Sequence, residues 1–168
     1  MTSTADGSML SDDHLDVDLL LADALEKLRS VNSRAAFDAL DLFWARLAMH
    51  IRAEHLHLFP AVMKFAQIHP ELPEKLERLR RDHDFFMHEL ADAIKAMRSM
   101  TAEPENEVVQ KTVSRLEEIK KRLEEHNAIE EETVYPLQRR LPRADAEQLS
   151  RSIGKELQNL PPRLRPEA

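Results

Sequence analysis

The sequence predicts an all-α fold: an up-down-up-down four-helix bundle followed by a short extra C-terminal helix. Of the 168 residues, 33% are charged and only two are glycine, a composition typical of long helices rather than sheets. Apolar residues recur at helical spacing through four long stretches, and short segments with turn residues or proline separate them. Long helices joined by short connections pack antiparallel around one core, and the chain length suits one domain.

The first two helices follow from cap signals and from proline. We expect residues 1–10 to form a flexible N-terminus, because they are small and polar. Ser11 is suited to cap a first helix that starts at the next residue. A turn at residues 32–33 leads into a second helix over residues 34–67, which ends before Pro70 because proline disfavours helix in the preceding residue.

Breaks at proline also separate the remaining elements. A third helix is expected over residues 71–100 and a fourth over residues 104–139, with a short amphipathic fifth over residues 144–157. The four-helix bundle is therefore expected to span residues 11–140, and residues 141–168 to hold the short helix and a proline-rich tail.

Composition excludes several functions. The chain has no cysteine, so disulfides, iron–sulfur clusters and thiolate zinc sites are excluded, and any metal must bind through histidine and carboxylates. The formal net charge of −7 argues against a nucleic-acid partner. Apolar runs are too short to span a membrane, and the first residues lack the features of a secretion signal. We therefore expect a soluble cytoplasmic protein.

Two matching stretches carry the chemistry. His50 and Glu54 lie four residues apart, and the stretch HIRAEHLHLFP that contains them returns 76 residues later as HNAIEEETVYP, with His126 and Glu130. Each pair ends in an aromatic residue and proline, and each follows apolar residues at the same three distances. Residues four apart share one face of a helix, so both pairs are predicted to point inward.

Two further histidines fall at the same depth of the predicted bundle. In an antiparallel bundle, residues equally far from a turn lie at one level. His14 and His50 are equally distant from the first predicted turn, and His83 and His126 are equally distant from the third. All four helices therefore bring a histidine to one level of the core, although the turns were placed without reference to these residues.

Six polar residues in an apolar core need a compensating partner, because each unpaired buried ionised group costs several kcal/mol. The candidate ligands are His14, His50, Glu54, His83, His126 and Glu130. Imidazole with carboxylate suits Fe, Mn or Zn, and two carboxylates from opposite helices can bridge two metals. A single histidine on an apolar face is more often a satisfied core residue, and a single His/Glu pair is common on solvated faces. The prediction of a metal site therefore rests on the six residues together, in matching contexts and at one level, and not on any one of them.

At these residues the chain resembles the hemerythrin family, in particular the bacterial hemerythrin-like (HHE cation-binding) domain. The motif is His14, His50-x3-Glu54, His83 and His126-x3-Glu130. The resemblance covers residues 10–140. It implies a four-helix bundle with two non-haem Fe ions, replaceable by Mn or Zn, bridged by both glutamates and an oxo or hydroxo group. A small diatomic ligand or peroxide would bind at an open iron position.

The chain departs from the oxygen carriers of that family at two places. The carriers have a second histidine one turn after that of the third helix, where this chain has Met87. They also have aspartate five residues after the histidine of the fourth helix, where this chain has Glu130 at four. These departures favour redox chemistry at a more open iron over reversible oxygen carriage. Met87 is also a good filler of core gaps.

Other polar residues near the motif receive weaker assignments. His57 is interpreted as an outer contact or as solvated, and His88 as outside the ligand set. His55 and Glu131 are expected to face water. Asp18, one turn after His14, is suited to orient that imidazole or to replace a missing ligand, but an exposed carboxylate is the preferred interpretation.

Three functions remain open from sequence. The first is a di-iron protein that binds or reduces dioxygen, peroxide or nitric oxide, with weak peroxide-decomposing or other oxidoreductase activity if it is an enzyme. The second is a metal- or iron-responsive sensor or binding module without turnover, with the segment after Leu141 as its output. The third is a structural bundle with a buried polar network. The oligomeric state is left open.

Overall fold

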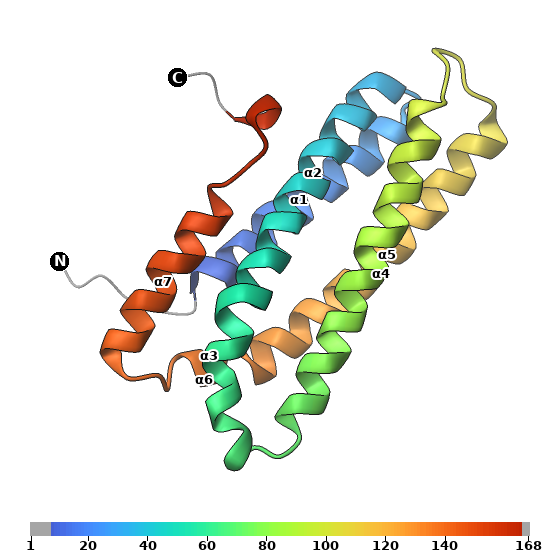
Figure 1. The fold of residues 1–168 in the computed structure, drawn as a ribbon. Helices are drawn as coiled ribbons and strands as arrows, with labels where there is room; N and C mark the ends of the chain where they lie inside the picture. Colours follow the sequence, from blue (N-terminus) through green and yellow to red (C-terminus); the bar gives the residue numbers. More distant parts are fainter. Residues whose placement is uncertain (1–7, 166–168) are drawn as a thin grey trace.

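A computed structural model describes residues 8–165, and every regular element in that range is helical (Figure 1). Four long helices form the body: α1 (Ser8–Arg29), α2 (Ser33–Ala53), α4 (Leu72–Arg98) and α5 (Asn106–Thr133). Each packs on the next along the chain, and α1 also packs on α5, so the four helices enclose one interior. The prediction of an all-α helical bundle is confirmed.

The continuation of α2 is less regular than predicted. A π-helical turn, η1 (Glu54–Leu58), follows α2 directly, and α3 (Phe59–Met63) and the 3₁₀ turn η2 (Lys64–Gln67) complete the rod. A π-turn inserts one extra residue into a helix and therefore rotates the side chains that follow it. The turn starts at Glu54, one of the six candidate ligands.

At the corresponding point of the second half, α5 ends instead of continuing through a π-turn. The predicted fourth helix over residues 104–139 is wrong at both ends, because α5 starts at Asn106 and stops at Thr133. The short helix α6 (Tyr135–Gln138) follows, with Pro136 in its first turn. Proline is favoured there because a first-turn N–H has no partner within the helix.

The start of the chain also differs from the prediction. Helix α1 begins at Ser8, three residues before the expected cap Ser11, and Leu10 is only 1% exposed. Burial of Leu10 in the core explains the longer helix. The remainder of the expected flexible N-terminus, residues 1–7, lies outside the described residues. At α2, the Asn32 side chain accepts a backbone N–H hydrogen bond of 3.2 Å and caps the helix.

Two apolar clusters fill the interior, one on each side of the level that holds the six polar residues. The larger cluster packs the halves of the four helices nearer the α1–α2 turn and includes Leu21, Phe43, Phe86, Leu90 and Leu116. The smaller cluster lies toward the opposite end and includes Leu10, Phe59, Leu79, Tyr135 and Ile153. The polar level is therefore closed from water at both ends by packed apolar side chains.

A helix lies close to where the short C-terminal helix was expected. Helix α7 (Arg143–Leu157) packs beside α2 and η1, and η3 (Pro162–Leu164) follows it (Figure 1). Arg163 pairs with the nearly buried Asp41 of α2 at 2.8 Å, which ties the end of the described chain to the bundle. Among the described helices, none combines the length and apolarity needed to cross a bilayer.

Candidate metal centre

The structure brings all six candidate ligands to one point between the two apolar clusters. Each of the six residues is 5% exposed or less. Helix α1 supplies one histidine, α4 supplies one, and the α2–η1 rod and α5 each supply a histidine and a glutamate. Their ligand atoms form two groups that share both glutamates, and within each group the atoms lie within 4.8 Å of one another. We name the groups the first position (His14, His50, Glu54, Glu130) and the second position (Glu54, His83, His126, Glu130).

Glu54 faces both positions with one oxygen each. Its Oε1 lies 3.2 Å from Nε2 of His50, in the first position, and its Oε2 lies 3.2 Å from Nε2 of His83, in the second. The approach of His83 does not have hydrogen-bond geometry, so Oε2 is a fully buried oxygen without a hydrogen-bond partner. A buried carboxylate oxygen in this condition is costly unless a cation binds it.

Glu130 repeats this arrangement with the oxygens exchanged between positions. Its Oε2 lies 3.3 Å from Nε2 of His14, in the first position, and its Oε1 lies 3.0 Å from Nε2 of His126, in the second. Oε1 likewise lacks a hydrogen bond of acceptable geometry. Each carboxylate is therefore placed to bridge two cations.

The histidines approach one another through their Nε2 atoms. Nε2 of His14 lies 3.1 Å from Nε2 of His50, and Nε2 of His83 lies 2.9 Å from Nε2 of His126. The opposite ring nitrogens, Nδ1, face partners outside the centre, and when Nδ1 donates its proton outward, Nε2 presents a lone pair inward. Lone pairs that converge on buried carboxylates form a donor set suited to a divalent cation, so the residues fit the metal pair that the motif predicts.

Two aspartates that the sequence analysis missed orient two of these rings. Asp13 Oδ2 accepts from Nδ1 of His50 at 2.8 Å, and Arg46 donates to the other Asp13 oxygen at 2.6 Å. On the other helix pair, Asp82 Oδ2 lies 3.4 Å from Nδ1 of His126, and Arg122 donates to Oδ1 at 2.7 Å. A sequence signal existed, because each aspartate directly precedes a candidate ligand histidine and the two arginines lie 76 residues apart.

The other two rings are oriented by residues that were expected to face water. His55 is half-buried, and its Nε2 lies 2.8 Å from Nδ1 of His83. Glu131 is 49% exposed, yet its Oε1 accepts from Nδ1 of His14 at 3.3 Å. The prediction for His55 was therefore wrong, and that for Glu131 was incomplete, because helical position alone does not show which neighbouring helix a side chain reaches.

Tyr135 adds a hydroxyl to the first position. Its buried O–H donates to Nε2 of His14 at 2.9 Å, and Glu54 and Glu130 lie 3.4 and 3.5 Å away. Burial and the negative charge of the two glutamates raise the pKa of Tyr135 well above its ordinary value, so the phenol stays protonated. The residue 76 positions earlier is Phe59, whose ring stacks on His83 at 6.0 Å.

The electrostatics of the metal-free centre follow from opposite charges in a closed space. Burial lowers the pKa of His50, but Glu54 and Asp13 outweigh it and raise that pKa to about 10. The pKa of His126 is raised for the same reason by Glu130. Burial favours a neutral Glu54, but the neighbouring histidines hold its pKa well below the ordinary value. Protons therefore occupy the centre when no metal does, and metal binding must release them.

The structure places the remaining polar residues of the motif away from the centre. Met87 packs on the larger apolar cluster, as expected of a gap-filler, and His88 is exposed on α4. His57 faces α7, where its Nε2 lies 3.6 Å from Glu156. Asp18 is half-buried, but among the described residues the hydrogen-bond partner of His14 Nδ1 is Glu131.

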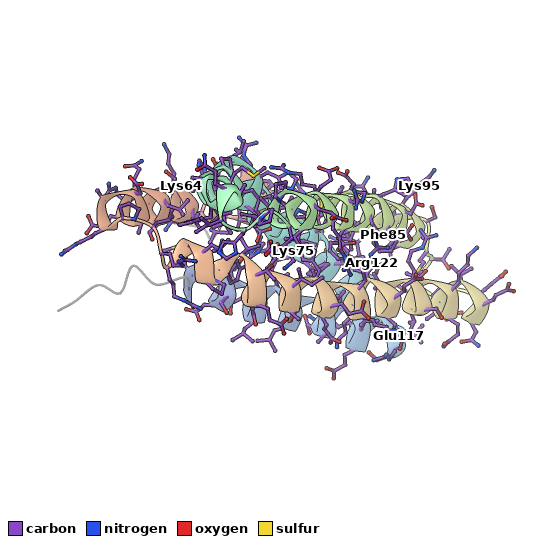
Figure 2. The ribbon with its side chains drawn as sticks, turned by 90° about the horizontal axis from the view of Figure 1, so that it is seen from below. Lys64, Lys75, Phe85, Lys95, Glu117 and Arg122 are labelled. Carbon is purple, nitrogen blue, oxygen red and sulfur yellow. The ribbon has the colours of Figure 1, made fainter. Side chains whose placement is uncertain are left out.

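An open cavity of about 590 Å³ lies between α4 and α5 and reaches the outer edge of the second position. Its lining includes Arg78, Lys121, Asp82 and His126. The guanidinium of Arg122, also in the lining, lies 4.0 Å from the centre of the Phe85 ring, and Figure 2 shows the two residues side by side. The cavity brings solvent close to the second position, whereas the first position faces Tyr135.

The fold and the buried histidine–glutamate centre define a helical-bundle protein with a metal-binding domain. The family model described as "Hemerythrin HHE cation binding domain" matches residues 7–137. The chain therefore belongs to the hemerythrin family, which confirms the resemblance seen in the sequence. Comparisons with curated proteins and with solved structures found no match.

Proposed function

We propose that this chain is an up-down-up-down hemerythrin-like protein that holds two non-haem iron ions and binds or reduces dioxygen, peroxide or nitric oxide there. One observation carries the proposal: Glu54 and Glu130 each direct one oxygen to each of two positions, and two histidines complete each position. Bound iron would supply redox equivalents and open coordination positions for the small ligand. We also propose that the protein is cytoplasmic.

The chain's own residues would orient the ligands and exclude water. Asp13 and Asp82 hold the rings of His50 and His126 with Nε2 inward, and outer contacts of this kind raise the basicity of the ligand nitrogen. The phenol of Tyr135 donates a hydrogen bond toward the first position and stays neutral. The cavity beside His126 offers a way in for a small ligand.

Metal analysis with absorption spectroscopy tests the proposal. Protein from iron-rich medium should contain about two irons per chain and show near-ultraviolet charge-transfer bands that change on addition of peroxide. His126→Ala and Glu130→Ala should abolish the bands, whereas His88→Ala and Glu132→Gln, at exposed positions, should not. Less than one transition metal per chain in the unmodified protein would contradict the proposal.

Oxygen release separates turnover from binding. If the centre decomposes peroxide, two molecules of hydrogen peroxide yield one of dioxygen and two of water, and an oxygen electrode measures the product. Loss of that release in Glu130→Ala, with retention in Glu132→Gln, would place the reaction at the centre.

A second candidate function is a metal- or iron-responsive module without turnover. The observation that favours it is the position of α7, which packs on η1, the π-turn that begins with Glu54. Arg52 and His57 of that rod both approach Glu156 of α7, at 2.9 and 3.6 Å. A change at Glu54 on metal binding would therefore reach α7 through direct contacts.

Hydrogen exchange distinguishes the two candidates. A sensor should show slower amide exchange in α7 when iron is bound than after chelation, with little peroxide turnover. Equal exchange in α7 with and without iron would contradict the sensor function and leave the redox function in place.

A further inference from the structure

Three of the four ligand histidines have carboxylates as outer partners, and one does not. Asp13 and Glu131 support the two histidines of the first position. In the second position Asp82 supports His126, but the partner of His83 is the imidazole of His55, with 2.8 Å between the nitrogens.

The internal repeat shows that this difference arises at one position, where the two otherwise matching halves carry different residues. Residues 55 and 131 lie 76 apart, each directly after the bridging glutamate of its helix. Each reaches across to the single histidine of the other helix pair: Glu131 contacts His14 on α1, and His55 contacts His83 on α4. The two halves therefore use the same geometry with different chemistry.

The chemistry changes how strongly each ring binds a cation. With Nε2 of His83 directed at the second position, Nδ1 carries the proton and donates it to Nε2 of His55, so His55 accepts through a neutral lone pair. A carboxylate in that place, such as Glu131, adds a negative charge near the cation and raises the basicity of the ligand nitrogen. The charges of the outer carboxylates agree with this, because Asp13 and Asp82 are each paired with an arginine. Among the described residues, the ion-pair partner of Glu131 is His14 itself.

We propose that the two metal positions are inequivalent, that the first fills before the second, and that His55 is the positioning residue that makes the second position the weaker one. This inference rests on the proposed two-metal function. The second position is also the one beside the open cavity, whose lining includes His126.

Cobalt(II) titration of the chelator-stripped full-length chain tests the inference. Calorimetry should resolve two binding steps of unequal affinity. The chain has one tyrosine, Tyr135, whose hydroxyl lies 2.9 Å from His14. Its near-ultraviolet difference band, separated from that of Trp44 by the same titration of Tyr135→Phe, reports on the first position. The tyrosine band should change mainly during the tighter step.

The matched variants exchange the two residue types between the halves. His55→Glu should tighten the weaker step by about 10- to 100-fold and bring the two steps together. Glu131→His should weaken the tighter step by a similar factor, and it serves as the independent arm if His55→Glu folds poorly. His88→Glu makes the same charge change at an exposed site of α4 and should leave both steps unchanged.

The outcomes separate this inference from the proposed function. Two cobalt ions bound with equal affinity, or a weaker step that His55→Glu leaves unchanged, would overturn the inference and leave the two-metal function standing. A tighter step that leaves the tyrosine band unchanged would overturn the order of filling. A wild-type chain that binds no cobalt would overturn the proposed function itself.

Discussion

The helix pairs α1–α2 and α4–α5 build the same inner arrangement from the same residue types. In each pair an Asp-His dipeptide on one helix faces an Arg, a His and a Glu spaced four residues apart on the other. The aspartate contacts both the arginine and the histidine of its partner helix in each half. The repeat therefore extends beyond the ligands to the groups that orient them.

The halves differ immediately outside that arrangement. The first half continues from its glutamate as a π-turn that contains His55, and α3 then begins with Phe59. The second half continues as α-helix with Glu131 and then breaks before Tyr135. Helix α7 packs on the α2–η1 rod of the first half. The inner residues match in the two halves because buried charges must be paired. The surrounding positions carry no such requirement, so the two halves differ chemically there.

The largest expected effect is on the number of bound metal ions, and it distinguishes a ligand shared by both positions from a ligand of one position. Glu130→Ala removes a carboxylate that serves both positions, so bound metal should fall from about two ions per chain to less than one. His14→Ala removes a ligand of the first position alone, and about one ion per chain should remain. Elemental analysis of both variants measures this, and equal losses would contradict the assignment of Glu130 as a bridge.

The next effect concerns the metal-free chain and pH. The pKa of His50 is raised from 6.5 to about 10 in the folded protein. A raised folded-state pKa stabilises the fold fully below the unfolded value, and this contribution disappears as pH rises through the folded value. Unfolding free energy from urea titrations should therefore decrease between about pH 7 and 10, on the order of a few kcal/mol. In His50→Gln the slope should flatten, whereas His88→Gln should retain it.

The six inner residues could be found in the sequence because one physical demand acts on all of them. Each must point into an apolar core, so each keeps helical register with Leu or Phe neighbours, and the register repeats after 76 residues. The predicted turns at residues 32–33 and near Pro104 then placed His14 level with His50 and His83 level with His126.

The outer residues were harder because their place in the repeat does not show which neighbouring helix each side chain reaches. Asp13 and Asp82 lie next to ligands in sequence but contact the histidine of a different helix, so only packing reveals the pair. His55 depends on the π-turn, whose extra residue has no sequence signature. Helix α1 starts earlier than predicted because Leu10 is buried in the core, and this burial has no cap signal in the sequence.

Replacement of these outer aspartates should produce unequal effects in the two halves. Asp13→Asn should weaken cobalt binding at the first position by about 10- to 100-fold, because an amide oxygen supports the imidazole less than a carboxylate does. Asp82→Asn should act on the second position with a smaller factor, because Asp82 lies 3.4 Å from its histidine whereas Asp13 lies 2.8 Å from its own. Calorimetric titration resolves the two effects, and a larger loss in Asp82→Asn would reverse this ranking of the halves.

The smallest effect tests whether the aromatic difference between the halves is chemical or structural. Tyr135→Phe gives the second half the ring that Phe59 supplies in the first, and both rings are buried to 2% exposure or less. The fold should persist, with a loss of about 1 kcal/mol for the hydrogen bond to His14. Urea denaturation measures that loss, and the number of bound metals should not change, because the histidines and glutamates remain. If Tyr135→Phe instead abolished metal binding at the first position, the phenol would belong to the ligand set, and the inner arrangements of the two halves would no longer be equivalent.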